Sequence, residues 1–216
     1  MSLGTIFVSD RIRSFPPLVV INKFKLDVES STQQDPRYAE HFPLGKIPCF
    51  IGPNGDLVLH EVIAITIYLV QAGDGERSAL LGRLKEEHAE ILKWMSFTNL
   101  DVLTAIDAFK PLVGMLPYDK KKVDDDLQWL GRYAQVYEAQ LSKSLYLVGD
   151  TFTIADLFCA VILSKAFEYF FDSSWRLDHP FVSRWFTKVM EDPDVVKVMG
   201  KFKWVDKKYE NVPPKI

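Results

Sequence analysis

Cysteine is scarce in this sequence, and the spacings that build metal or redox sites are missing. The only two cysteines, Cys49 and Cys159, lie far apart and outside any Cys-x-x-Cys pair. Their number and spacing argue against a disulfide framework, a zinc site and a dithiol redox motif. None of the four histidines has a neighbour at metal-ligand spacing, and no Ser/His/Asp or glycine-rich phosphate signature stands out. We therefore expect no bound metal.

Long apolar runs and basic clusters are also missing. No run approaches the roughly 20 apolar residues of a membrane span, and the N-terminus lacks a basic region followed by an apolar stretch. The net charge is -3, and no block of lysine and arginine interleaves with aromatic residues, so nucleic acid is not an expected ligand. The 216 residues are 48% hydrophobic, enough for a substantial core. We expect a soluble cytosolic (cytoplasmic) protein without membrane contact.

The first third of the chain alternates short β-rich runs with helical patterns. Pro16 and Pro17 suit the first turn of a helix, and Asn54-Gly55 suits a tight hairpin turn. The expected order is β-α-β-α-β-β-α, with strands at 5–8, 26–29, 49–51 and 57–59 and helices at 16–24, within 33–41 and from 61 to about 73. We assign residues 1–76 to this first, α/β domain.

Beyond roughly Arg77 the patterns are helical throughout. Residues 84–113 are amphipathic, and apolar residues from Val123 to Leu141 recur at spacings of three and four. Thr153 and Asp156 have the spacing of a capping box, a structural device at the start of a helix. Further helices are expected at 180–190 and 192–200. We assign residues 84–216 to a second, all-α domain.

The segment from Phe42 to Glu61 resembles the glutathione site of thioredoxin-like glutathione transferases. In that family a cis-proline follows a residue whose backbone pairs with the cysteine of glutathione, and Glu-Ser at the next helix start holds the γ-glutamyl end. Ile47-Pro48 fills the first role here, and Glu61-Val62 stands in place of Glu-Ser. The resemblance implies glutathione as cosubstrate, a thioredoxin-like N-terminal domain and an all-α C-terminal domain. Without it, the same residues are an ordinary hairpin with a turn proline.

Longer motifs are similar to the transferase-like domain of the gamma subunit of translation elongation factor 1B. They are Met1-Ser2-x-Gly4-Thr5, Phe42-Pro43-Leu44-x-Lys46-Ile47-Pro48, Trp94-x-Ser96-Phe97, Tyr146-Leu147-Val148-Gly149, Trp175-Arg176-x-x-His179-Pro180 and Arg184-Trp185-Phe186. That subunit continues through a lysine-rich linker into a separate domain, and neither is present in these 216 residues. The resemblance implies a homodimer packed through residues 56–70 and the long helix that begins near Leu84.

Activation of the glutathione thiol needs a group that favours the thiolate, because the ordinary thiol pKa is near ~8.5. Ser9 ends the first expected strand and precedes Arg13 by four residues, as the serine of the theta and delta transferase classes precedes an arginine. The resemblance implies that Ser9 donates a hydrogen bond to the sulfur and that Arg11 and Arg13 supply positive potential. The alternative is that Ser9 and Ser14 only end the strand and cap the helix.

Other residues are candidates for the two ends of glutathione. Gln33 and Gln34 fall where phi-class enzymes carry His-Lys for the glycine carboxylate, and Lys46 is the candidate cation there. Glu61 is expected to accept the γ-glutamyl ammonium, although any acid is favourable at a helix N-terminus. Val62 keeps its backbone N–H but lacks the serine hydroxyl, which predicts binding weakened by roughly 10- to 150-fold.

A second pocket, for an apolar electrophile, is expected between the two domains. Its candidate lining residues are Phe109, Met115, Leu116, Phe167, Phe170 and Phe171. An aromatic stripe at helical spacing is more often core, so at most two or three of these side chains are expected to face a ligand. Asp101, on the long helix, is expected to reach the glutathione of a partner subunit, as acidic residues there do in relatives.

Two functions remain open. One is a glutathione-dependent enzyme that adds the thiolate to an electrophilic carbon, either releasing a conjugate or reversing after bond rotation to isomerise an olefin. Some free-standing relatives of this kind act in fungal natural-product pathways. The other is a non-catalytic module that docks an exchange-factor subunit. The missing lysine-rich linker favours the enzyme, and Val62 favours the docking module.

Overall fold

The computed structural model describes residues 2–75 and 78–214, which form two compact units. Of these residues, the first unit contains 2–75, 78–88 and 193–200, and the second contains 89–192 and 201–214. The predicted end of the first domain at residue 76, and the predicted change of pattern near Arg77, lie outside the described residues.

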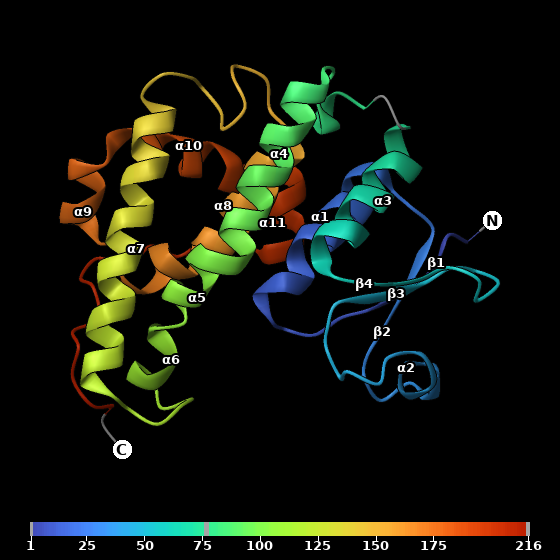
Figure 1. Cartoon of the computed structure of the whole chain (residues 1–216), viewed down its shortest axis with the longest axis horizontal. Helices are drawn as coiled ribbons and strands as arrows, with labels where there is room; N and C mark the ends of the chain where they lie inside the picture. The colour runs from blue at the N-terminus through green and yellow to red at the C-terminus, as the bar shows by residue number, and fades with distance from the viewer. Residues whose placement is uncertain (1, 76–77, 215–216) are drawn as a thin grey trace. The chain divides into compact units, whose positions relative to one another are not determined.

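The first unit is built on a four-stranded sheet in the order β2-β1-β3-β4 (Figure 1). The strands are β1 (Gly4–Phe7), β2 (Val28–Ser31), β3 (Cys49–Ile51) and β4 (Val58–His60). β1 runs parallel to β2 and antiparallel to β3, and β3 runs antiparallel to β4. The predicted order of strands and helices is confirmed. β2 begins two residues later than predicted, because its pairing with β1 starts at Val28 opposite Gly4.

Helices complete the first unit. They are α1 (Phe15–Phe24), α2 (Pro36–His41), α3 (Val62–Asp74) and α11 (Pro193–Met199), with short 3-10 turns at Ile12–Ser14 and Ala79–Leu81. α1 and α3 pack side by side. α11 comes late in the chain but packs on α1. There the Asp194 carboxylate accepts from the side-chain amide of Asn22 at 2.7 Å and forms a salt bridge with Lys23 at 3.3 Å.

The second unit is helical in the residues that the structure describes. Its helices are α4 (Lys85–Phe97), whose first turn, up to His88, belongs to the first unit, a π-helical turn (Thr98–Val102), α5 (Leu103–Ile106), α6 (Phe109–Leu112), α7 (Lys120–Leu141), α8 (Ile154–Tyr169), α9 (Ser173–Asp178) and α10 (Pro180–Met190). The amphipathic pattern predicted over 84–113 is therefore helical as far as Ile106 and then breaks. Pro111 explains the break, because it cannot donate to the carbonyl of residue 107 and its ring clashes there.

α8 forms the centre of the second unit and is buried along most of its length. The predicted capping box at its start is present: the Thr153 amide and hydroxyl donate to Asp156 Oδ2 at 2.8 and 3.0 Å. The other oxygen of Asp156 accepts from the Leu147 amide and the Trp185 indole, both at 2.9 Å. Asp156 thus ties α8 to α10 and to the preceding loop. Among the described helices, none has the length and apolar character needed to cross a lipid bilayer.

Candidate functional site

One end of the sheet carries the last residues of β1, β2 and β4 and the first residue of β3. β1 ends at Phe7 and β4 ends at His60, and both of these residues pair with Cys49, the first residue of β3. Ser9, Ile47 and Glu61 each lie one or two residues beyond these last pairs. The sheet therefore brings together the predicted thiol-activating serine, the predicted backbone-pairing residue and the predicted ammonium acceptor, although they are distant in sequence.

Ile47 combines a packed side chain with an unpaired backbone. Its side chain packs against the buried cluster that contains Phe7, Tyr38 and Cys49. The Ile47–Pro48 peptide bond is cis, as the resemblance implies, and Pro48 is buried. Within residues 2–75 and 78–214, no group forms a hydrogen bond with the amide N–H or carbonyl oxygen of Ile47. These two backbone groups are therefore available to another peptide.

The start of α3 lies beside this backbone edge. Glu61 and then Val62, the first residue of α3, directly follow His60, the β4 residue that pairs with Cys49, and α3 contacts β3. The first-turn amides of a helix have no partner inside the helix and favour a negative group. Glu61 precedes them with an exposed side chain and a φ of 74°, a conformation that costs free energy for a residue with a Cβ. Val62 is buried, and its side chain has no hydroxyl to offer at this position.

Ser9 is held by two local hydrogen bonds. Its backbone amide donates to the Ser14 hydroxyl at 3.1 Å, and its own hydroxyl oxygen accepts from the Arg11 amide at 3.3 Å. Because the oxygen accepts from Arg11, the hydroxyl hydrogen is left to be donated elsewhere. Arg11 is exposed and Arg13 is half-buried in the 3-10 turn before α1. Ser14 is buried and accepts from the Ser9 amide, but its side chain makes no capping hydrogen bond to α1, so the helix cap of the alternative interpretation is absent.

Gln33 has a different role in the structure from the one predicted. Its Nε2 donates to the Tyr38 hydroxyl at 3.1 Å and to the Gly45 carbonyl at 3.0 Å, which uses both hydrogens of the amide. It therefore supports the loop before Ile47 and has no donor left for a carboxylate. Gln34 and Lys46 are exposed, and the Gln34 side chain remains a candidate for the glycine end.

The predicted residues of the second unit fall into two groups. Phe167 is wholly buried, and its ring centroid lies 3.8 Å from that of Phe186, on which it stacks. Phe170 and Phe171 are also buried, so these three side chains are core residues. Phe109 is buried against Tyr169 at 4.5 Å, whereas Met115 and Leu116 are 65% and 52% exposed. Asp101 is exposed on the π-helical turn. Met115 and Leu116 are therefore the accessible members of the predicted electrophile set.

Both cysteines are buried, and the pKa of each thiol is raised. Burial, reinforced by the charge of Glu61, raises the pKa of the Cys49 thiol to about 11. Burial raises the pKa of the Cys159 thiol to about 12. Neither side chain has the depressed pKa of a reactive cysteine. The described residues also contain no group of three or more His, Cys, Asp or Glu side chains that could hold a metal.

We expect iodoacetamide to label neither cysteine readily in the folded protein. A shift of two pKa units leaves Cys49 with about 100-fold less thiolate at pH 8, and burial restricts access further. Mass spectrometry after a timed reaction counts the modified residues. In urea both cysteines should be modified under the same conditions. Fast modification of Cys49 without urea would contradict the burial of this thiol.

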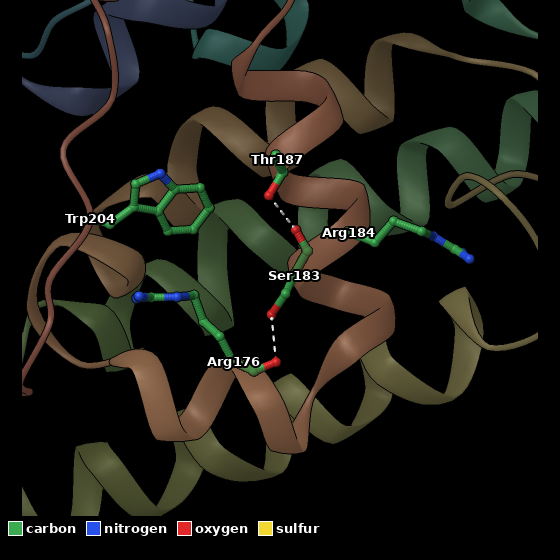
Figure 2. Close-up of a pocket in the computed structure, with 5 residues that line it drawn as sticks. All are labelled: Arg176, Ser183, Arg184, Thr187 and Trp204. Atoms are coloured by element: carbon green, nitrogen blue, oxygen red, sulfur yellow. Dashed lines mark hydrogen bonds between the residues drawn. The ribbon is translucent and has the colours of Figure 1, made fainter.

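The second unit has a surface depression lined mainly by polar and basic side chains. Its lining residues are Arg176, Ser183, Arg184, Thr187 and Trp204 (Figure 2). The hydroxyls of Ser183 and Thr187 donate to the carbonyls of Arg176 and Ser183, at 3.2 and 2.8 Å. The Arg176 guanidinium donates to the carbonyls of Phe171 and Val205. Because these donors are used inside the unit, we assign the depression no ligand.

The sequence patterns missed Tyr38, which the structure places directly behind the site. Its hydroxyl donates to the Lys46 carbonyl at 2.8 Å, and its ring is buried between Phe7 and Phe42. A tyrosine in a six-residue helix carries no local signal of such a role. Only the fold brings it to the peptide before Ile47.

Comparisons with known proteins agree with this geometry. Residues 18–71 match the family described as glutathione S-transferase, N-terminal domain, and residues 94–193 match glutathione S-transferase, C-terminal domain. Glutathione S-transferase psoE of Aspergillus fumigatus is 35% identical over 221 residues, covering 99% of this chain and 91% of that protein.

The elongation factors form a second set of relatives. Elongation factor 1-gamma 1 of Saccharomyces cerevisiae is 35% identical over 96% of this chain, but the match spans only 51% of the elongation factor. The chain thus spans about half the length of that relative. The crystal structure of the GST-like domain of elongation factor 1-gamma from Saccharomyces cerevisiae has a TM-score of 0.88 and 34% identity, with 100% of both chains covered. The two domain matches and the relatives at 35% identity show that this chain belongs to the glutathione S-transferase superfamily.

Proposed function

We propose that the protein is a glutathione-dependent transferase or isomerase that acts on an apolar electrophile. The observation that carries this proposal is the unpaired backbone of Ile47 beside the start of α3 and Ser9. An extended peptide that pairs with Ile47 gains two backbone hydrogen bonds. Glutathione is a short peptide with a carboxylate and an ammonium at its γ-glutamyl end. The first-turn amides of α3 suit the carboxylate, and the Glu61 carboxylate suits the ammonium.

In this proposal Ser9 stabilises the thiolate. The hydroxyl hydrogen that the Arg11 amide leaves available is donated to the sulfur, and a hydrogen bond to the charged form lowers the thiol pKa. The thiolate then forms a bond to an electrophilic carbon. Departure of a leaving group with its electron pair gives a conjugate. For an activated olefin, rotation about the former double bond followed by loss of the thiolate gives the isomer and regenerates glutathione.

Exposed apolar side chains in the second unit support an apolar electrophile as the second substrate. Met115 and Leu116 are the members of the predicted set that are open to solvent, and apolar surfaces of this kind favour apolar ligands. Asp101, Gln34 and Lys46 are further proposed glutathione contacts. We also propose that the protein acts as a homodimer, which is the usual state in this family.

A non-catalytic docking module is the second candidate function. Val62 favours it, because it offers no hydroxyl to the γ-glutamyl carboxylate and its side chain is buried. The similarity to elongation factor 1-gamma 1 is as high as the similarity to transferase psoE, at 35% identity for each. In this case the partner is an exchange-factor subunit, and glutathione turnover is absent.

The Ser9→Ala variant tests the catalytic proposal. We expect the rate of conjugation of glutathione to 1-chloro-2,4-dinitrobenzene to fall by about 10- to 100-fold in kcat, with the KM for glutathione nearly unchanged. The reason is that Ser9 contacts the reacting sulfur but not the rest of the peptide. The pH profile of kcat should move to higher pH in the variant. Equal kcat values and superimposed pH profiles would remove Ser9 from the mechanism.

A further inference from the structure

Two buried donors converge on the carbonyl oxygen of Lys46, directly before Ile47. The Tyr38 hydroxyl donates to it at 2.8 Å, and the Cys49 thiol donates to it at 3.0 Å. The two side chains are 5% and 1% exposed. The Lys46 carbonyl and the Ile47 amide belong to one planar peptide group, in which they point in opposite directions when the bond is trans. Holding the oxygen inward therefore directs the Ile47 N–H away from Tyr38 and Cys49.

The orientation of the Tyr38 hydroxyl is itself fixed. Its oxygen accepts from Gln33 Nε2 at 3.1 Å, so its single hydrogen is available for the Lys46 carbonyl. The Phe7 and Phe42 rings lie 5.7 and 5.5 Å from the Tyr38 ring and hold it in place. The second hydrogen of Gln33 Nε2 goes to the Gly45 carbonyl at 3.0 Å. Gln33 and Tyr38 thus tie down the two residues that precede Ile47.

We propose that Tyr38 is a positioning residue for the glutathione-pairing backbone of Ile47, supported by Gln33 and Cys49. It acts through the peptide group between Lys46 and Ile47, which it holds in the binding orientation before the ligand arrives. Binding then requires less ordering of the loop, so the affinity is higher than for a mobile loop. This inference rests on the proposed function, because it assumes that Ile47 pairs with glutathione.

The Tyr38→Phe variant removes the hydroxyl and keeps the ring. We expect the Kd of reduced glutathione, measured by calorimetry, to rise by about 3- to 10-fold. The matched control is Tyr118→Phe, which removes a tyrosine hydroxyl that donates to the Asn211 carbonyl in the second unit at 3.1 Å. Each variant should lower the Tm by a few degrees at most, but only Tyr38→Phe should weaken binding.

The cysteine supplies a rescue test. Cys49→Ala removes the second donor and should raise the Kd by about 2- to 5-fold, whereas Cys49→Ser keeps a donor and should bind more tightly than Cys49→Ala. A purely structural effect of Cys49 would track the Tm of the two variants and not the presence of the donor.

A measurement without ligand separates this inference from the proposed function. The NMR order parameter of the Ile47 amide in the free protein should fall in Tyr38→Phe and stay unchanged in Tyr118→Phe. If the unsubstituted protein does not bind glutathione while the Ile47 amide loosens in Tyr38→Phe, the proposed function fails and the positioning of Ile47 by Tyr38 stands. If glutathione binds equally to Tyr38→Phe and the unsubstituted protein, and the amide is unchanged, the inference is overturned and the function stands.

Discussion

Replacement of Glu61 by glutamine is expected to weaken the binding of reduced glutathione by about 10- to 150-fold. The Glu61 carboxylate is exposed at the start of α3, where the γ-glutamyl ammonium is proposed to bind. A hydrogen bond between charged groups contributes about 1.5–3 kcal/mol, and glutamine keeps the shape but loses the charge. Calorimetric titration of the variant gives the change in Kd directly.

The matched control is Glu86→Gln. Glu86 is also an exposed glutamate in the first turn of a helix, α4, and it belongs to the same compact unit. Loss of its charge should leave the glutathione Kd unchanged within about 2-fold. Equal effects of the two substitutions would mean that helix charge, and not a contact at Glu61, controls binding.

The backbone of Glu61 adds a second, independent comparison. Its φ of 74° is unfavourable for glutamate but natural for glycine. Glu61→Gly should therefore retain the stability of the unsubstituted protein while it loses glutathione binding. Retention of binding by Glu61→Gly would show that the side chain is not the ligand for the ammonium group.

Replacement of Asp156 by asparagine is expected to destabilise the helical unit by about 3–5 kcal/mol. The buried carboxylate accepts four hydrogen bonds, two on each oxygen, from the Thr153 amide and hydroxyl, the Leu147 amide and the Trp185 indole. In asparagine one oxygen becomes an NH₂ group that faces donors, so two buried donors lose their acceptor. Urea unfolding followed by circular dichroism measures the loss.

Asp150→Asn is the control for Asp156. The Asp150 carboxylate accepts one hydrogen bond, from the exposed Leu145 amide at 3.0 Å. Its replacement should cost less than about 1 kcal/mol. A difference of under about 1 kcal/mol between Asp156→Asn and the unsubstituted protein would contradict the role of Asp156 in joining α8 to α10.

Local patterns predicted the elements that have strong local signals. The hairpin of β3 and β4 and the Thr153–Asp156 capping box are each specified by a few adjacent residues, and the structure contains them. The turn itself is wider than predicted: the Gly55 amide donates to the Gly52 carbonyl, which makes Pro53 and Asn54 its central residues, and only Gly55 of the predicted pair has a positive φ. The prediction placed β2 two residues too early, because Ser30 and Ser31 have little strand preference and are in the strand only through their pairing with β1. The break after Ile106 was missed because the apolar spacing continues through Pro111.

Long-range packing was beyond the reach of the sequence patterns. A helix was expected at 192–200, but nothing in its sequence shows that it packs on α1 through Asp194 and Asn22. The resemblance located Ser9, Ile47 and Glu61, and the sheet brings these positions to one end. Gln33 was predicted as a donor to glutathione. The sequence did not reveal its hydrogen bonds to Tyr38 and Gly45, because these form only in the folded loop.

The most direct test is calorimetric titration of the unsubstituted protein with reduced glutathione. A peptide-pairing edge at Ile47 beside the start of α3 predicts saturable binding, with a Kd between about 10 μM and a few mM. The lack of a hydroxyl at Val62 places the expected value in the weaker part of this range. The absence of binding at ~10 mM glutathione would contradict the proposed glutathione site and leave the docking module as the function.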